Sequence, residues 1–132
     1  MRQTRPARPS ARLAAACLIA ALAVPGLSAG PAQAAEFRVI TDRDSFLTAV
    51  GGRELSYRGF RLRVSPQGGI TGRGLGREVT GEWQWQGRYF CRTLRWGRTD
   101  VGANCQTVAA NDSAIRFQAD EGQGDVAIFR MR

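Results

Sequence analysis

Seventeen consecutive residues, 81–97, read GEWQWQGRYFCRTLRWG and hold three Trp, one Tyr, one Phe, one Cys and three Arg. Aromatic rings offer large apolar surfaces, and guanidinium groups bind anions through paired hydrogen bonds. The stretch could therefore line a site for a small apolar or anionic ligand, or it could be the core of a small sheet. The candidate ligand-binding residues are Trp83, Trp85, Arg88, Phe90, Arg92 and Trp96, with Arg88 or Arg92 as the anchor for an anionic group.

Little in the sequence favours catalysis. The chain contains no His, which removes the Ser-His and Cys-His pairs that activate a nucleophile and every metal site that needs imidazole. Its acids, such as Glu82, Asp100, Asp120 and Glu121, show no spacing diagnostic of a catalytic pair. The sequence therefore predicts no catalytic residues, no metal site and no cofactor, and it favours a non-enzymatic protein over an enzyme.

The N-terminal residues have the pattern of an export signal. Four Arg come before or at the start of a run of twelve apolar residues, LAAACLIAALAV, which is too short to span a bilayer that requires about 20. Ala32, Gln33 and Ala34 then match an A-x-A cleavage site. We expect residues 1–34 to be a cleaved signal peptide and residues 35–132 to be a single small β domain, periplasmic or secreted, without a stable membrane anchor.

Two cysteines remain after the predicted signal peptide, Cys91 and Cys105. An exported chain with an even number of cysteines is typical of disulfide formation in an oxidising compartment. We therefore predict a disulfide between these two residues. It would close a loop of about 15 residues and contribute roughly 3 kcal/mol in the chain-entropy description.

The net charge of residues 35–132 indicates which classes of partner to expect. These residues carry 15 Arg, no Lys and 11 acids, a net charge of +4 without a run of adjacent basic residues. Nucleic-acid binding usually requires a clustered basic surface, so nucleic acid is not an expected partner. The partners that remain are a small molecule or a cell-envelope protein.

A helix is predicted from about residue 43 to residue 50, after a short strand at 37–40. Thr41 or Asp42 can cap the helix N-terminus, and Gly51 can adopt the left-handed conformation that often ends a helix. One helix face is apolar because its residues recur at helical spacing. That face comprises Phe46, Leu47 and Val50.

From residue 53 onward the sequence has a pattern typical of antiparallel strands. Short alternating runs such as FRLRV are separated by turn residues at intervals of about ten. Glycine is about twice as frequent here as its average of roughly 7%, and it permits the tight turns and bends of a curled sheet. The predicted fold class is mainly β: an antiparallel meander or a small curled, lipocalin-like β-barrel with one short N-terminal helix.

The aromatic stretch is expected to form a hairpin with a two-residue turn at Gln86-Gly87. This register pairs Trp83 with Phe90, and it separates an apolar face from a more polar one. The apolar face then collects Val79, Trp83, Trp85, Phe90, Leu94 and Trp96, with Arg88 and Arg92 among them.

A second hairpin, with its turn around Arg98, would place Cys91 directly opposite Cys105. Directly opposed residues of antiparallel strands lie close enough for a disulfide. The bridge would then lie on the more polar face of the sheet, and the aromatic face would point inward.

The pattern G-x-W-x-W-x-G-x-Y-F-C, followed by N-C-Q and preceded by DRDSFLTAVGGREL, resembles a group of small exported bacterial proteins of unknown function. The resemblance covers nearly the whole of residues 35–132. Some similar chains carry the name dihydrodipicolinate reductase, but that activity needs a nicotinamide-binding Rossmann domain, which the residues here do not support. The resemblance implies a fold and a compartment, and it supplies no catalytic residues.

Two classes of function remain open. The first is a non-enzymatic periplasmic binding module, a small barrel whose aromatic wall holds a modest apolar or amphipathic ligand. The second is a protein-interaction or inhibitor module in which Trp, Tyr and Arg form an exposed patch of strongly binding residues. The sequence favours the first, because the paired aromatic face is more continuous than core packing alone requires. Whether that face is solid core or the wall of a cavity is left open.

Overall fold

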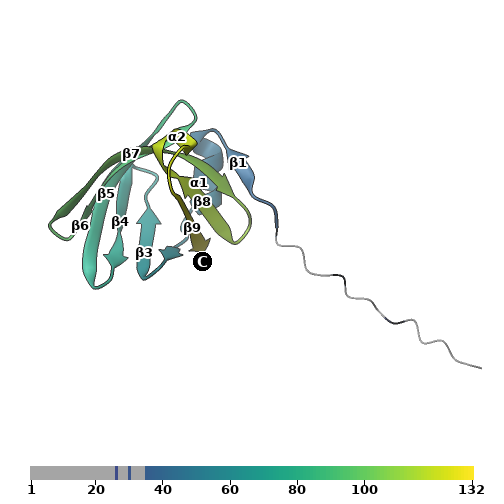
Figure 1. Ribbon diagram of the computed structural model, residues 1–132, viewed down its shortest axis with the longest axis horizontal. Coiled ribbons are helices and arrows are strands. Elements are labelled where there is room, and N and C mark those ends of the chain that lie inside the picture. Colours follow the sequence, from purple (N-terminus) through teal and green to yellow (C-terminus); the bar gives the residue numbers. More distant parts are fainter. Residues whose placement is uncertain (1–25, 27–29, 31–34) are drawn as a thin grey trace, which may run out of the picture. The chain divides into compact units, whose positions relative to one another are not determined.

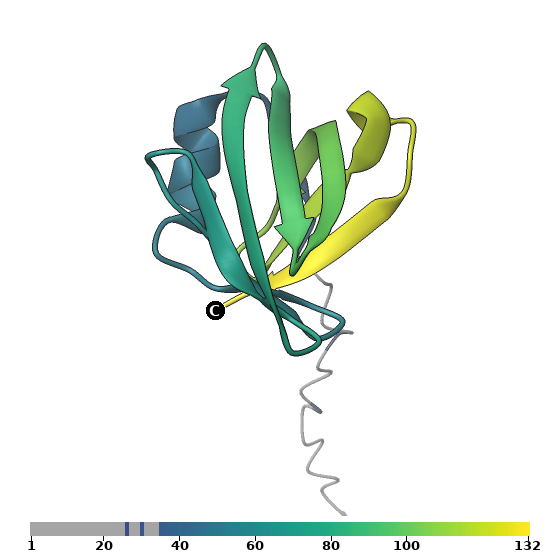
Figure 2. The same cartoon turned by 90° about the vertical axis from the view of Figure 1, so that its left-hand side faces the viewer.

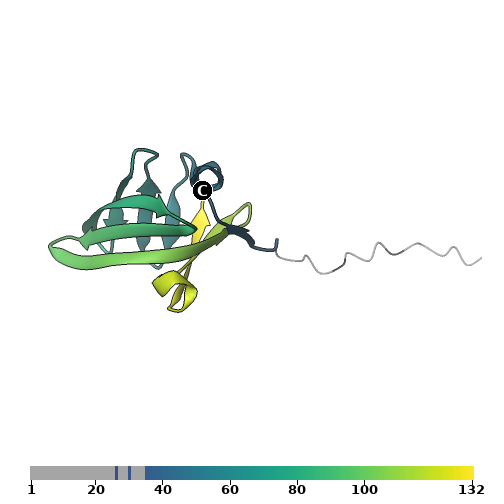
Figure 3. The same cartoon turned by 90° about the horizontal axis from the view of Figure 1, so that it is seen from above.

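A computed structural model describes residue 26, residue 30 and residues 35–132 of the chain. Apart from Gly26 and Gly30, the predicted signal peptide lies outside the described residues. The strands of residues 35–132 curve around a common interior, and Figures 2 and 3 both show the two helical segments on opposite sides of it.

Eight of the described strands form a closed antiparallel barrel (Figure 1). Each pairs with the next along the chain, and the last pairs with the first. A further short strand, β1 (Arg38–Ile40), pairs with the end of β7. The predicted fold class is therefore confirmed, and the barrel is the form adopted. The barrel strands are β2 (Leu55–Tyr57), β3 (Phe60–Val64), β4 (Gly69–Gly74), β5 (Arg77–Gln86), β6 (Tyr89–Trp96), β7 (Thr99–Ala110), β8 (Ala114–Gln118) and β9 (Val126–Met131).

The predicted turn of the aromatic hairpin is wrong, and the pairing of its two strands is shifted by two residues from the predicted pairing. Gln86 pairs with Tyr89, so the turn residues are Gly87 and Arg88. Gly87 has a φ of 59° and occupies the first turn position, as a type II′ turn requires. Because side chains alternate with a period of two, the shift leaves the apolar face intact but moves Arg88 from that face into the turn.

The second hairpin confirms the predicted disulfide. Cys91 lies directly opposite Cys105, and the two sulfur atoms are bonded. Gly97 and Arg98 form the turn, and the register shifts once between Leu94 and Arg95. The bridge lies on the outer, more polar side of the barrel wall.

The helix α1 (Arg43–Val50) has the predicted bounds. Its N-cap is Asp42, whose Oδ1 accepts a hydrogen bond from the Ser45 backbone N at 2.8 Å. The predicted left-handed Gly51 is wrong: its φ is −49°, and Gly52 takes the left-handed conformation with a φ of 66°. Gly51 meets a different constraint, because a Cβ there would lie 2.9 Å from the Leu47 carbonyl oxygen.

The apolar face of α1 packs into the barrel. Phe46 is completely buried, and its ring centroid lies 4.9 Å from that of Phe90, 5.2 Å from that of Trp83 and 5.5 Å from that of Trp85. Figure 2 shows α1 beside the strands, toward the end of the barrel where β5 and β6 join. One helical side chain therefore fills this part of the interior.

A second helical segment, α2 (Ala119–Gly122), joins β8 to β9 and was not predicted. Asp120 and Glu121 both have positive φ, so the segment is a left-handed turn rather than a regular helix. Asn104 holds it against β7: its Nδ2 donates to Asp120 Oδ1 at 2.8 Å, and its Oδ1 accepts from the Asp120 backbone N.

Candidate functional site

The part of the barrel interior that α1 does not fill contains a cavity of about 150 Å³, called the lumen cavity here. Its lining comes from seven strands, and nine of its eleven residues are apolar. These residues alternate with exposed ones along β3 and β9. They are Leu55, Leu62, Val64, Ile70, Phe90, Arg92, Leu94, Gln106, Phe117, Ala127 and Phe129.

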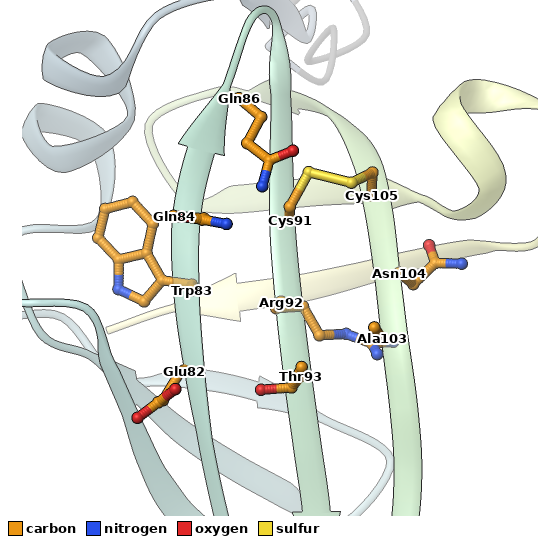
Figure 4. A pocket seen from close by; sticks show the side chains of 10 residues that line it. All are labelled: Glu82, Trp83, Gln84, Gln86, Cys91, Arg92, Thr93, Ala103, Asn104 and Cys105. Atoms are coloured by element: carbon orange, nitrogen blue, oxygen red, sulfur yellow. A yellow bond between two sulfur atoms is a disulfide. The ribbon is translucent and has the colours of Figure 1, made fainter.

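Arg92 is the one charged residue in the lining of the lumen cavity. It is half-buried, and its Nη1 donates a hydrogen bond to the Gly102 carbonyl oxygen at 3.1 Å. Figure 4 shows its side chain reaching from β6 toward Ala103 of β7. Burial lowers the pKa of the Arg92 guanidinium, although an arginine remains charged at neutral pH.

Among the described residues, no carboxylate accepts a hydrogen bond from Arg92. A guanidinium has five N–H donors, and the bond to Gly102 uses one of them. A half-buried cation with unused donors beside an apolar cavity has the chemistry to receive an anionic group that enters from that cavity.

The indole N–H groups of the three Trp are all hydrogen-bonded within the protein. Each indole Nε1 donates to a backbone carbonyl oxygen: Trp83 to Ser65 at 2.8 Å, Trp85 to Gly87 at 3.0 Å and Trp96 to Gly74 at 2.7 Å. None of the three lines the lumen cavity. They lie in other parts of the interior and leave no indole N–H free to bind a ligand.

Each Trp has its own surroundings. Trp83 is only 5% exposed and packs in the core with Phe46. Trp85 is half-buried and approaches α1 through the same Phe46. Trp96 packs against Phe60, with a centroid distance of 5.9 Å, and the Arg77 guanidinium lies 4.6 Å above its ring. The six candidate residues therefore do not form one site.

Two of the six, Phe90 and Arg92, line the lumen cavity. Arg88, the other predicted anchor, is exposed in the β5–β6 turn. There it lines a separate groove of about 360 Å³ together with Arg116 and Tyr89. The structure thus separates the two predicted anion anchors: Arg88 lies in the turn, and Arg92 lines both the lumen cavity and the hollow beside the disulfide.

The residues that sequence reasoning missed are the apolar lining residues outside the aromatic hairpin, such as Leu62 and Phe129. Their signal was present in the alternation of FRLRV, AIRFQ and VAIFRM. Alternation identifies an inward face but cannot indicate whether the side chains on it meet or leave a space.

The disulfide lies at a hollow of about 320 Å³ on the outer side of β5, β6 and β7 (Figure 4). Polar side chains surround the bridge, among them Glu82, Gln84 and Thr93. A disulfide of this kind is typical of an oxidising, extracytoplasmic environment. The bridge staples β6 to β7 next to Arg92, the neighbour of Cys91 in sequence.

The described residues offer neither a metal site nor a membrane-spanning helix. No group of three or more His, Cys, Asp or Glu residues in this part of the chain could hold a metal ion. No helix within the same residues is long and apolar enough to cross a membrane.

Comparison with known proteins identifies no relative. No protein-family model, curated protein or solved structure matches the chain.

Proposed function

We propose that the protein is an exported, non-enzymatic carrier or sensor that binds a small apolar anion in the lumen cavity. The observation that carries the proposal is the combination of an apolar cavity with one half-buried guanidinium, that of Arg92, in its wall. The apolar lining favours a hydrocarbon group, and the guanidinium favours a carboxylate or similar anion at one end of it.

The volume of the lumen cavity limits the size of the ligand. A dry apolar cavity of about 150 Å³ accommodates a benzene molecule, and the lumen cavity has about this volume. The expected ligand is therefore an aromatic ring or a short branched chain with one anionic group. Benzoate has both features and serves as a probe.

The proposed compartment has two supports. The disulfide between Cys91 and Cys105 favours an oxidising environment, and residues 1–34 have the pattern of a cleaved export signal. The family resemblance proposed from the G-x-W-x-W-x-G-x-Y-F-C pattern favours the same compartment. Mass spectrometry of the protein from its producing cell should find a chain that begins at Ala35 and has lost two hydrogens.

The sequence also suggested a protein-interaction module built on exposed aromatic side chains. The burial of the three Trp does not support this second class. Trp83 is 5% exposed, and Trp85 and Trp96 are half-buried. Strongly binding patches at protein interfaces need such rings at the surface. We therefore retain the binding of a small ligand as the proposal.

The test is calorimetric titration of benzoate and of benzyl alcohol, its neutral counterpart of similar size. Replacing Arg92 by Met should weaken benzoate binding about ten- to a hundredfold, because a hydrogen bond to a charged group contributes roughly 1.5–3 kcal/mol. Benzyl alcohol should bind both proteins alike. The matched control is Arg95→Met, which removes an exposed guanidinium from the same strand.

Measuring the stability of the Arg92→Met variant shows whether weaker benzoate binding comes from the loss of the guanidinium or from unfolding of the protein. Arg92→Met removes the desolvation cost of a half-buried charge and also removes the hydrogen bond to the Gly102 carbonyl oxygen. These two effects oppose each other, so the midpoint of urea unfolding should change little. If a stably folded Arg92→Met variant bound benzoate as well as the unchanged protein does, the proposed role of Arg92 would be wrong.

A further inference from the structure

A row of arginines crosses the outer side of the barrel on β9, β2, β3 and β4. The strand register places Arg130 opposite Ser56, Ser56 opposite Arg61, and Arg61 opposite Arg73. All three arginines are exposed, and the residues that alternate with them, such as Leu62 and Met131, point inward. Adjacent strands lie about 4.8 Å apart, so about 15 Å of the curved barrel wall separates the backbone of Arg130 from that of Arg73.

Arg63 adds a fourth cation to this surface, two residues from Arg61 on the same side of β3. The four residues Arg61, Arg63, Arg73 and Arg130 are called the arginine face. Directly opposed like charges, as in the pair of Arg61 and Arg73, destabilise a sheet. An anion bound between the two guanidinium groups would remove this repulsion.

The hydrogen bonds that the described residues offer the arginine face come from backbone carbonyl oxygens, which carry no formal negative charge. Arg63 donates to the Gly52 carbonyl oxygen and Arg73 to the Gly76 carbonyl oxygen, both at 3.1 Å. Among the described residues, no carboxylate accepts a hydrogen bond from any arginine of this face. The acids nearest in register are Glu78, opposite Arg73, and Glu54, whose backbone pairs with that of Arg132.

Apolar side chains continue the same surface along β9. Val126 and Ile128 are each 46% exposed and lie on the same side of the strand as Arg130. Ile128 lies opposite Arg116 of β8, so a cation also flanks it on the other side. Most exposed apolar side chains need no explanation, but these two lie beside the arginine face.

We propose that the arginine face, with Val126 and Ile128 beside it, binds reversibly to an anionic lipid surface. A lipid surface offers many equivalent phosphates, which guanidinium groups bind in pairs of hydrogen bonds, and an apolar boundary for the two aliphatic side chains. Each cation near such a surface strengthens binding about fivefold, which corresponds to roughly 1 kcal/mol. The combination of charge with exposed apolar residues is what distinguishes a lipid surface from a soluble polyanion as the partner.

The first experiment sediments the protein with vesicles. Phosphatidylcholine vesicles with about one third phosphatidylglycerol should bind it, pure phosphatidylcholine vesicles should not, and added salt should release it. The double variant Arg61→Gln/Arg73→Gln should bind about twentyfold more weakly. The matched control is Arg88→Gln/Arg98→Gln, which removes two exposed cations from hairpin turns and should bind nearly as the unchanged protein does.

The apolar part of the proposal has its own variant. Ile128→Ser should weaken binding to the anionic vesicles several-fold, while binding to dextran sulfate, a soluble polyanion, should be weak and unaffected by this change. The proposal is overturned if the unchanged protein does not bind the anionic vesicles, if the arginine and control variants bind them alike, or if Ile128→Ser has no effect. The same variants should bind benzoate as the unchanged protein does, so the lipid proposal and the proposed ligand of the lumen cavity can fail independently.

Discussion

The two halves of the barrel interior are built from the same strands but are filled differently. In one half, Phe46 of α1 inserts among Trp83, Phe90 and Phe117, and the rings pack at centroid distances of 4.9–6.4 Å. In the other half, Leu62 and Phe129 are half-buried beside the lumen cavity, whereas Leu55 and Ile70 in the same lining are buried. Phe90 and Phe117 pack near Phe46 and also line the lumen cavity, so they form the boundary between the halves.

The difference shows how a small barrel can combine stability with a binding cavity. Ring-on-ring packing around Phe46 supplies a dense core, so the remaining interior does not have to be filled. The one charged residue of the cavity wall, Arg92, lies in the hollow half. Substitutions in the two halves should therefore have different consequences, and four predictions follow this contrast.

The largest effect is expected from Phe46→Ala, which removes the ring that fills the dense half. Phe46 is completely buried, and replacing such a ring by Ala costs about 3–5 kcal/mol because of the cavity left behind. Urea unfolding measures the loss. Leu47→Ala, on the half-buried side of the same helix, is the control and should cost less. Equal losses for the two variants would mean that Phe46 does not support the core as described.

Removal of the disulfide should have the next largest effect. Cys91→Ser/Cys105→Ser opens a loop with a sequence separation of 14 and should lower the free energy of unfolding by about 3 kcal/mol. The bridge is on the outer side of the wall, so benzoate affinity should change little while the protein remains folded. A large loss of affinity in the folded variant would show that the staple also positions the neighbouring Arg92.

A matched pair of enlarging substitutions compares a completely buried core position with a position beside the lumen cavity. Ile115 is completely buried, and Ile115→Phe should destabilise the protein by about 1–3 kcal/mol because a packed core cannot accept the extra atoms. Leu62→Phe places a similar increase beside the lumen cavity and should cost less than about 1 kcal/mol. It should also abolish benzoate binding. If Leu62→Phe were the more destabilising of the two, the hollow half would not be hollow.

The smallest effect concerns the N-cap of α1, the element that fills the dense half. Hydrogen bonds from the Ser45 backbone and side chain lower the pKa of Asp42 from its ordinary value of 3.8. Because the folded protein favours the carboxylate, the cap stabilises it above that ordinary value, and this contribution is lost as the pH falls through the lowered pKa. Unfolding measured across acidic pH should therefore show a small pH-dependent loss that Asp42→Asn, with its amide oxygen as acceptor, does not show.

Much of the fold could be predicted from local patterns. Alternation along 60–64 and 89–96 identified inward and outward faces, and the spacing of Phe46 and Val50 identified the buried side of α1. The disulfide followed from the pair of cysteines in a chain with an export signal, although its direct cross-strand opposition also depends on the register shift between Leu94 and Arg95. These features depend on neighbours in sequence or on a two-residue period, which the sequence displays directly.

The errors have a common physical origin. A glycine can take either position of a two-residue turn, depending on the turn type, and a slip of two residues leaves every side chain on the same face. The pattern of apolar residues therefore could not reveal that Gln86 pairs with Tyr89, which moves Arg88 away from the aromatic face. Only the pairing of distant strands, such as β2 with β9, determines which side chains surround the lumen cavity.

The contrast between the halves, and the ligand site it implies, is tested most directly by methyl NMR of the protein titrated with benzoate. The methyl groups of Leu62 and Leu94, beside the lumen cavity, should shift and show direct contacts to the ring protons of benzoate. Those of Val50, which is buried on the same face of α1 as Phe46, should be unaffected. The Arg92→Met variant should lose the shifts. Saturable binding with contacts at Val50, or no contact at Leu62 and Leu94 at any concentration, would contradict a ligand site in the lumen.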